Sequence, residues 1–189
     1  MNTKLKKIYF LRSHPTHNNY SHIATPAIGN MSKWKRRFGS REEPWWESGV
    51  NFTCLPDCGR CCDEPGGIVY LSREDAERIA NHLDISLKQW LTENCRTSFD
   101  GRFVLESKPE DGRCIYLTGE KTCSIYEVKP AQCSAFPFWR ENVVSERTWE
   151  KTKALCPGID HDDAIEIHGD SIKLNLEADR IAEKGFRFI

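Results

Sequence analysis

The sequence predicts a small α+β domain that is rich in loops and stapled by bound metal. Three observations support this fold class. Short helical and strand patterns occur in mixed order, long stretches with Pro and Gly separate them, and nine cysteines occur between residues 54 and 156. The chain has 189 residues, enough for one compact domain and an extension but not for two domains with full cores. A domain with so much loop is of the kind that a metal stabilises.

Residues 1–43 are predicted to be a poorly ordered N-terminal extension. The stretch 12–30 is rich in His, Asn, Ser, Thr and Pro and has no sustained apolar period. We interpret the basic run 33–37 as a solvated tail, with an arm that binds nucleic acid or a partner as the alternative. Met31, at the end of the featureless stretch, is an alternative to Met1 as the translation start.

The N-terminus and the charge balance bear on location and partners. The apolar run 8–11 is shorter than the core of a secretory signal, which has about 7–15 residues. No apolar run approaches the roughly 20 residues that span a bilayer. We therefore expect a cytoplasmic protein that does not have a membrane as its partner. Because 28 acidic side chains nearly balance 27 basic ones, nucleic acid is not expected as a partner either. An unidentified protein partner remains open.

The ordered domain is predicted over residues 44–160, and its first elements have clear boundaries. Residues 68–71 form a short β-rich run. Ser72, with Asp75 three residues later, is typical of a helix start, and Ser86 repeats this pattern. The buried faces of these two helices follow helical spacing at Ala76, Ile79, Ala80 and Leu83 and then at Leu87, Trp90 and Leu91.

Two strands and one helix are predicted in the middle of the domain. Residues 102–106 and 114–117 have strand patterns. Ser145 is expected to cap a helix over 146–154 that carries Trp149 inward.

The C-terminal part, residues 161–189, is predicted to pack on the same domain as a hairpin and a helix. The runs 164–168 and 171–176 alternate in polarity, and Gly169-Asp170 between them suggests a hairpin turn. A last helix is expected over about 177–184.

The cysteines predict metal binding. In a reducing cytoplasm a cysteine-rich chain is seldom a disulfide framework, and nine cysteines cannot all pair within one chain. Four of them lie within nine residues, and ordinary buried cysteines occur singly. Two cysteines that are separated by two residues can hold one ion, and Gly59 permits the tight backbone path between them. This dense group comprises Cys54, Cys58, Cys61 and Cys62.

A second group of cysteines is scattered, and most of its members lie near a proline or a turn. Such a position leaves backbone amides free to hydrogen-bond to sulfur. The group comprises Cys114, Cys123, Cys133 and Cys156, so that eight thiols are available, enough for two four-sulfur sites or for one cluster with spare thiols. Cys95 is expected on the apolar side of a helix, near Leu91, and we interpret it as a core residue. Cys61 and Cys62 point to opposite faces in an extended chain, and they could therefore serve different sites.

The spacing of the eight cysteines resembles a known family. The pattern C-x3-C-x2-C-C (CxxxCxxCC), then C…C…P-x-x-C…F-P and a late C-P-G, is similar to that of the YkgJ-type cysteine-cluster proteins, described as zinc- or iron-chelating domains. The resemblance covers residues 45–159 and implies metal binding. Related clusters occur in flagellin lysine N-methylases. Lys129 and Ser134 stand where the family often has arginine.

Thiolates bind both iron and zinc. Zinc in a four-sulfur site usually takes two well-spaced C-x2-C pairs, whereas this chain has one such pair inside a crowded cluster. C-x3-C-x2-C also matches the three-ligand motif of radical S-adenosylmethionine enzymes, but the residues after Cys62 do not alternate strand with helix as those enzymes require. We prefer iron, as an iron–sulfur cluster, and keep zinc as the alternative.

Two functions are compatible with these observations. The first is a metal-binding module that is structural or docks a partner, because cysteines account for most of the unusual chemistry. The second is an iron–sulfur enzyme for redox chemistry or protein modification, as in the flagellin methylases, because thiols are in excess. No glycine-rich phosphate loop, nucleophile elbow or S-adenosylmethionine-binding motif is evident. The sequence does not decide between the two.

Overall fold

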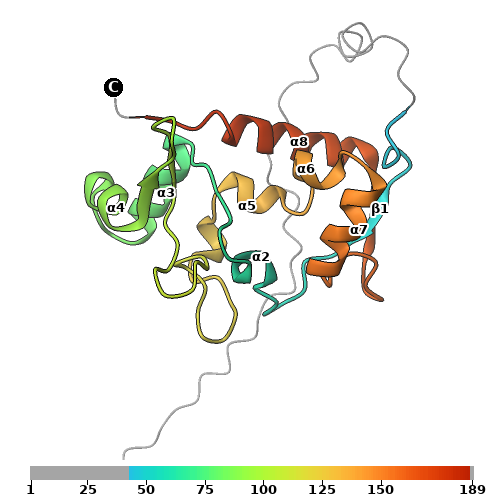
Figure 1. Cartoon of the computed structure of the whole chain (residues 1–189), viewed down its shortest axis with the longest axis horizontal. Coiled ribbons are helices and arrows are strands. Elements are labelled where there is room, and N and C mark those ends of the chain that lie inside the picture. The colour runs from blue at the N-terminus through green and yellow to red at the C-terminus, as the bar shows by residue number, and fades with distance from the viewer. Residues whose placement is uncertain (1–42, 188–189) are drawn as a thin grey trace, which may run out of the picture. The chain divides into compact units, whose positions relative to one another are not determined.

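The computed structural model describes residues 43–187, which form a small α+β domain as predicted (Figure 1). The predictions for the N-terminal extension, the basic run 33–37 and Met31 lie outside these residues. The elements are β1 (Val50–Phe52), α2 (Arg60–Asp63), α3 (Arg73–His82), α4 (Leu87–Asn94), β2 (Cys95–Thr97), β3 (Phe103–Leu105), η2 (Tyr126–Val128), α5 (Ala131–Ala135), α6 (Arg140–Val143), α7 (Glu146–Leu155), β4 (Ile165–Ile167) and α8 (Gly169–Ala182).

The strands form two antiparallel pairs that join distant parts of the chain. β1 pairs with β4, with Val50 opposite Ile167, and β2 pairs with β3, with Cys95 opposite Leu105. A single bridge between Tyr70 and Val104 adds the segment before α3 to the second pair. Each strand has only three residues, so side-chain packing has to provide most of the stability.

The three predicted helix starts are confirmed, because each begins at a serine whose side chain accepts a backbone N–H. Ser72 and Asp75 form a reciprocal capping box at α3, and Ser145 does the same with Thr148 at α7. Ser86 accepts the N–H of Gln89 at α4. Such a cap satisfies an amide that the helix leaves free, a contribution of about 1 kcal/mol each.

The predicted C-terminal hairpin is wrong. Residues 171–176 belong to α8, and the strand at 165–167 pairs with β1 instead. The alternation of polar and apolar residues in 171–176 was compatible with either structure, but the buried positions Ile172, Asn175, Asp179 and Ala182 follow helical spacing. Gly169, the first residue of α8, lies against the backbone of Glu47, where a Cβ would be 2.5 Å from the carbonyl oxygen. The predicted strand 114–117 is also absent.

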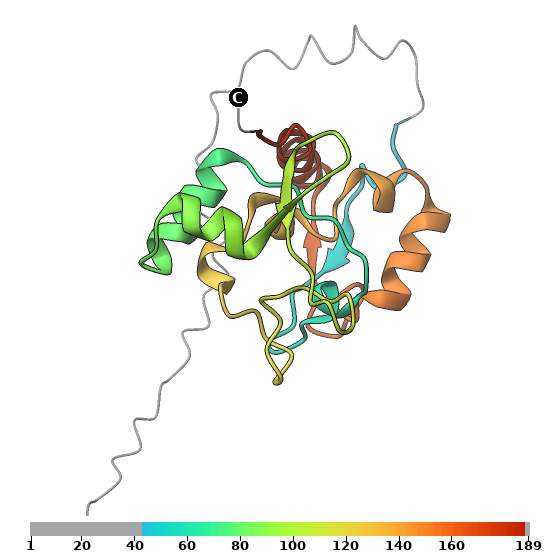
Figure 2. The same cartoon turned by 60° about the vertical axis from the view of Figure 1, so that its left-hand side comes forward.

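The core has two parts, with α5 between them (Figures 1 and 2). One part lies beneath α3 and α4 and surrounds Trp90, whose indole N–H donates to the Tyr116 hydroxyl at 2.7 Å. The other lies between the β1–β4 pair and α7, where Phe138 stacks on Trp149 at a centroid distance of 5.7 Å. In the described part of the chain, no helix has both the length and the apolar character that crossing a membrane requires.

Two buried carboxylates hold α5 in place. Asp75 of α3 accepts the N–H of Ala131 at 3.1 Å, at the start of α5. Asp179 of α8 accepts the side-chain amide of Gln132 at 2.9 Å and the N–H of Arg140 at 3.0 Å. Both carboxylates are almost fully buried, so water could not take their place as the acceptor for these N–H donors.

The Asp179→Ala variant is expected to lose about 2–4 kcal/mol of unfolding free energy, because it leaves buried donors on Gln132 and Arg140 without an acceptor. Asp170→Ala on the same helix removes a carboxylate that is 81% exposed and pairs with Lys173, and it should cost less than about 1 kcal/mol. Urea denaturation of both variants measures the difference. Equal losses would show that Asp179 does not hold α5.

Candidate metal centre

The dense cysteine segment enters a very short helix. Residues 53–59 are irregular, and Gly59 then takes a left-handed conformation (φ 54°) that turns the chain into α2. Cys61 and Cys62 both lie on α2, with their sulfurs 4.0 Å apart. Our expectation that they point to opposite faces assumed an extended chain and is wrong, because helical residues one apart differ by roughly 100°.

α2 rests directly on the segment 107–123, which carries two scattered cysteines. The N–H of Cys114 donates to the carbonyl of Cys62 at 3.1 Å, and the N–H of Gly66 donates to the carbonyl of Gly112 at 3.0 Å. Gly59 approaches Lys121 so closely that a Cβ on it would lie 1.9 Å from the Lys121 carbonyl oxygen. Figures 1 and 2 both show α2 beside this segment.

Four sulfurs converge where these two segments meet. The Cys62 sulfur lies 4.0 Å from the Cys61 sulfur, and interactions with Cys114, Cys123 and Cys61 raise the pKa of Cys62. The interaction with Cys62 lowers the pKa of Cys123 to about 6 and that of Cys61 to about 7, and it also lowers the pKa of Cys114. The four thiols therefore titrate as a coupled group. We call these four residues the inner cysteines.

Three of the scattered cysteines have a nearby backbone amide that favours the thiolate form. The backbone N–H two residues further along donates to the sulfur in each case, from Tyr116 to Cys114, from Ile125 to Cys123 and from Gly158 to Cys156. A hydrogen bond from an amide to an anionic sulfur is stronger than one to a neutral thiol. The amides after Cys114 and Cys123 thus contribute to a lowered pKa, whereas burial outweighs the amide at Cys156.

We call the other four predicted ligands the outer cysteines: Cys54, Cys58, Cys133 and Cys156. The segments of Cys54 and Cys156 are joined by a hydrogen bond from the N–H of Thr53 to the carbonyl of Gly158 at 3.0 Å. Burial raises the pKa of Cys156 to about 11 and also raises the pKa of Cys54, which is nevertheless exposed at its surface. Cys156 interacts electrostatically with Cys58, Cys54 and Cys61, so these segments lie within reach of one another's charges.

Cys133 and Cys95 occupy different surroundings. Cys133, on α5, is affected by the charges of Cys114, Cys61 and Cys123, and burial raises its pKa well above the usual value. Its helix therefore faces the inner cysteines. For Cys95, burial and then the charge of Glu106 raise the pKa to about 12, and its side chain packs on the core beneath α3 and α4.

Charged and aromatic residues next to the sulfurs were not predicted from the sequence. Asp63 follows Cys62 and pairs with cations from the opposite segment. Lys129 lies over the Tyr126 ring, with its Nζ 4.1 Å from the ring centroid, and its charge lowers the pKa of Cys54 and Cys61 against the effect of burial. A pattern in the sequence could have revealed part of this, because a basic residue comes one or two positions before three cysteines: Arg60, Arg113 and Lys121.

The donors fit a thiophilic metal in chemistry, although they are not packed around an ion. Within residues 43–187, no three His, Cys, Asp or Glu side chains are already placed close enough together to hold one ion. The converging sulfurs and the amide donors aimed at them nevertheless provide the soft anionic ligands that iron and zinc take. We conclude that the residues fit such a metal.

Eight thiols from four segments of a small α+β domain define a cysteine-cluster protein. The chain belongs to the CxxCxxCC family, whose model matches residues 53–157 and is described as "Putative zinc- or iron-chelating domain". The matched region contains all eight predicted ligands and confirms the resemblance that the cysteine spacing suggested. No solved structure matches the chain.

Proposed function

We propose that this domain binds iron through its cysteine thiolates, and that the inner cysteines supply the first ligands. The observation that carries the proposal is the convergence of Cys61, Cys62, Cys114 and Cys123 from two segments about fifty residues apart. Sulfurs so close would repel one another as thiolates unless a cation compensated their charge. The outer cysteines provide further thiols for the same centre.

Iron, as an iron–sulfur cluster, is our preferred metal, and zinc is the alternative. A structural zinc site is closed by four ligands, usually from two separate C-x2-C pairs. Here Cys58 and Cys61 form one such pair, and Cys62 is an additional adjacent thiol. An iron–sulfur cluster would supply one-electron redox chemistry when bound.

Backbone amides and a lysine near the cysteines favour thiolates at this centre. The amides of Tyr116 and Ile125 help to lower the pKa of Cys114 and Cys123, and Lys129 adds a positive charge nearby. Cys54 and Cys61 are exposed, so the centre has a side that faces solvent. A metal held here would join segments that lack helices and strands of useful length, which supports a structural or partner-docking module.

Protein purified without oxygen tests the proposal by metal analysis and absorption spectroscopy. Brown protein that contains iron and sulfide and bleaches with dithionite is the expected result. Colourless protein with stoichiometric zinc would contradict the choice of iron but not the metal centre. Absence of both metals, even after reconstitution with each, would contradict the proposal as a whole.

The Cys62→Ser variant is expected to retain less than half of the wild-type metal content, because Cys62 interacts with all three other inner cysteines. Cys95→Ser is the matched control, since Cys95 is a partly buried thiol whose pKa is affected by Glu106 and not by another cysteine. Metal content per chain, with circular dichroism to verify folding, measures the difference. Full metal content in the Cys62 variant would remove this residue from the site.

A further inference from the structure

We propose that Asp63 is a positioning residue that keeps the two cysteines of α2 facing Cys114 and Cys123. This inference rests on the proposed metal-binding function and adds a residue that is not itself a ligand. Asp63 lies next to Cys62, and its carboxylate faces the segment that carries the other two inner cysteines.

The carboxylate of Asp63 joins the two segments by ion pairs. One oxygen accepts a hydrogen bond from the Arg113 guanidinium at 2.8 Å. The other lies 3.4 Å from the Lys121 ammonium and 3.9 Å from a guanidinium nitrogen of Arg60 on its own helix. Arg113 directly precedes Cys114, and Lys121 is two residues before Cys123. Each ion pair between α2 and the facing segment therefore involves a residue next to, or two before, an inner cysteine.

The segment that provides the cations for Asp63 has ion pairs and hydrogen bonds of its own. Arg113 also pairs with Asp111 at 2.6 Å, which orients its guanidinium toward Asp63. Lys108 donates its ammonium to the carbonyl of Leu117 at 2.6 Å, which closes the loop from 108 to 117. Asp63 therefore meets cations whose positions are set by their own loop.

The ion pairs of Asp63 matter because α2 is too short to fix its own orientation. A helix of four residues is far below the length that is stable alone, and none of its side chains is fully buried. The backbone bonds from Cys114 to Cys62 and from Gly66 to Gly112, with the packing of Gly59 on Lys121, place α2 on the facing segment, and Asp63 adds side-chain contacts to them. Asp63 is only 17% exposed, so its charge is less screened than that of an ordinary surface carboxylate.

Cobalt(II) binding to the complete, metal-free protein provides the test, because thiolate ligation to cobalt gives intense charge-transfer absorption. We expect Asp63→Asn to bind cobalt about tenfold more weakly than wild type, as is typical when a group that orients ligands is removed. Asp63→Glu keeps the charge and should recover most of the affinity.

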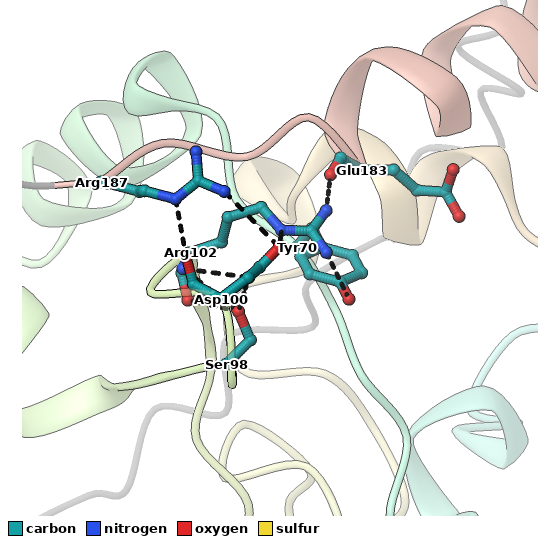
Figure 3. Close-up of polar contacts among 6 residues, drawn as sticks. All are labelled: Tyr70, Ser98, Asp100, Arg102, Glu183 and Arg187. Atoms are coloured by element: carbon teal, nitrogen blue, oxygen red, sulfur yellow. Dashed lines mark hydrogen bonds and ion pairs between the residues drawn. The ribbon is translucent and has the colours of Figure 1, made fainter.

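Asp100→Asn is the matched control. Asp100, like Asp63, pairs with cations, here Arg102 and Arg187, and it accepts a hydrogen bond from Ser98. It lies in the turn between β2 and β3 (Figure 3). This variant should bind cobalt within about twofold of wild type.

The outcomes separate the two proposals. Wild-type affinity in Asp63→Asn, or an equal loss in Asp100→Asn, would overturn the positioning role. Failure of wild-type protein to show thiolate–cobalt absorption would instead contradict the metal centre itself. A loss in Asp63→Asn that Asp63→Glu does not recover would show that the charge is not what Asp63 contributes.

Discussion

Removal of the metal is expected to lower the melting temperature of the protein by roughly 10 °C. Saturation at about a thousand times the dissociation constant stabilises a fold by about 4 kcal/mol, and each kcal/mol corresponds to about 2–4 °C for a domain of this size. The loss should be local, because the segments that carry the cysteines depend on the metal more than the helices do.

The two segments that should open are 53–67 and 107–125. They contain only the short helix α2 and isolated bridges such as that between Leu117 and Cys123. In contrast, α3, α4 and α8 bury Ile79, Trp90 and Ile172 completely. Metal-free protein should therefore keep helical circular dichroism while the cysteine segments lose order.

Hydrogen exchange with and without metal measures this difference. Amides in 53–67 and 107–125 should lose protection after chelation, whereas those in α3 and α8 should change little. The Cys62→Ser variant without added chelator serves as an independent metal-poor sample. Uniform loss of protection across all helices would contradict the local model, and unchanged protection in the cysteine segments would show that the metal does not stabilise them.

The sequence predicted the helix starts well because their physics is local. Ser72, Ser86 and Ser145 each cap a helix by accepting an amide within the next turn, so the residues that decide the structure are neighbours in the sequence. The prediction of the C-terminal hairpin was wrong because the alternation of polar and apolar residues was short and fitted both the helical and the strand period. Pairing of β4 with β1, more than a hundred residues away, decided the outcome.

The candidate site shows the same division between local and distant contacts. The cysteines could be predicted as a group from composition and spacing, because four thiols within nine residues have no common packing role. The sequence could not show which of them converge, since this depends on how α2 rests on residues 107–123. Asp63 was missed for the same reason, because its partners Arg113 and Lys121 are some fifty residues away.

Gly59→Ala is expected to separate the inner cysteines and to abolish most metal binding. Gly59 has φ of 54°, a conformation that costs other residues roughly 1–2 kcal/mol. An added Cβ would also lie 1.9 Å from the Lys121 carbonyl oxygen and 2.9 Å from the Leu117 side chain. Because the nearest atom is backbone, no rotamer change can relieve the clash, and α2 has to move away from the segment with Cys123.

The position of Gly59 makes this variant more damaging to the centre than to the fold. The displaced contact lies between α2 and residues 117–121, outside the buried surfaces of α3, α4 and α8. We expect an unfolding free energy lower by about 3 kcal/mol, the sum of the conformational cost and a partly relieved clash. Metal analysis and urea denaturation measure the two effects.

Gly119→Ala is the matched control for this prediction. Gly119 lies in the same loop as Lys121, but a Cβ there meets nothing within 4 Å and its φ is not positive. It should retain metal and stability, because a compatible Gly→Ala change even restricts the unfolded chain. If Gly59→Ala retains metal as Gly119→Ala does, the close contact between α2 and the Lys121 backbone does not set the spacing of the sulfurs. The convergence that supports the metal centre would then need another cause.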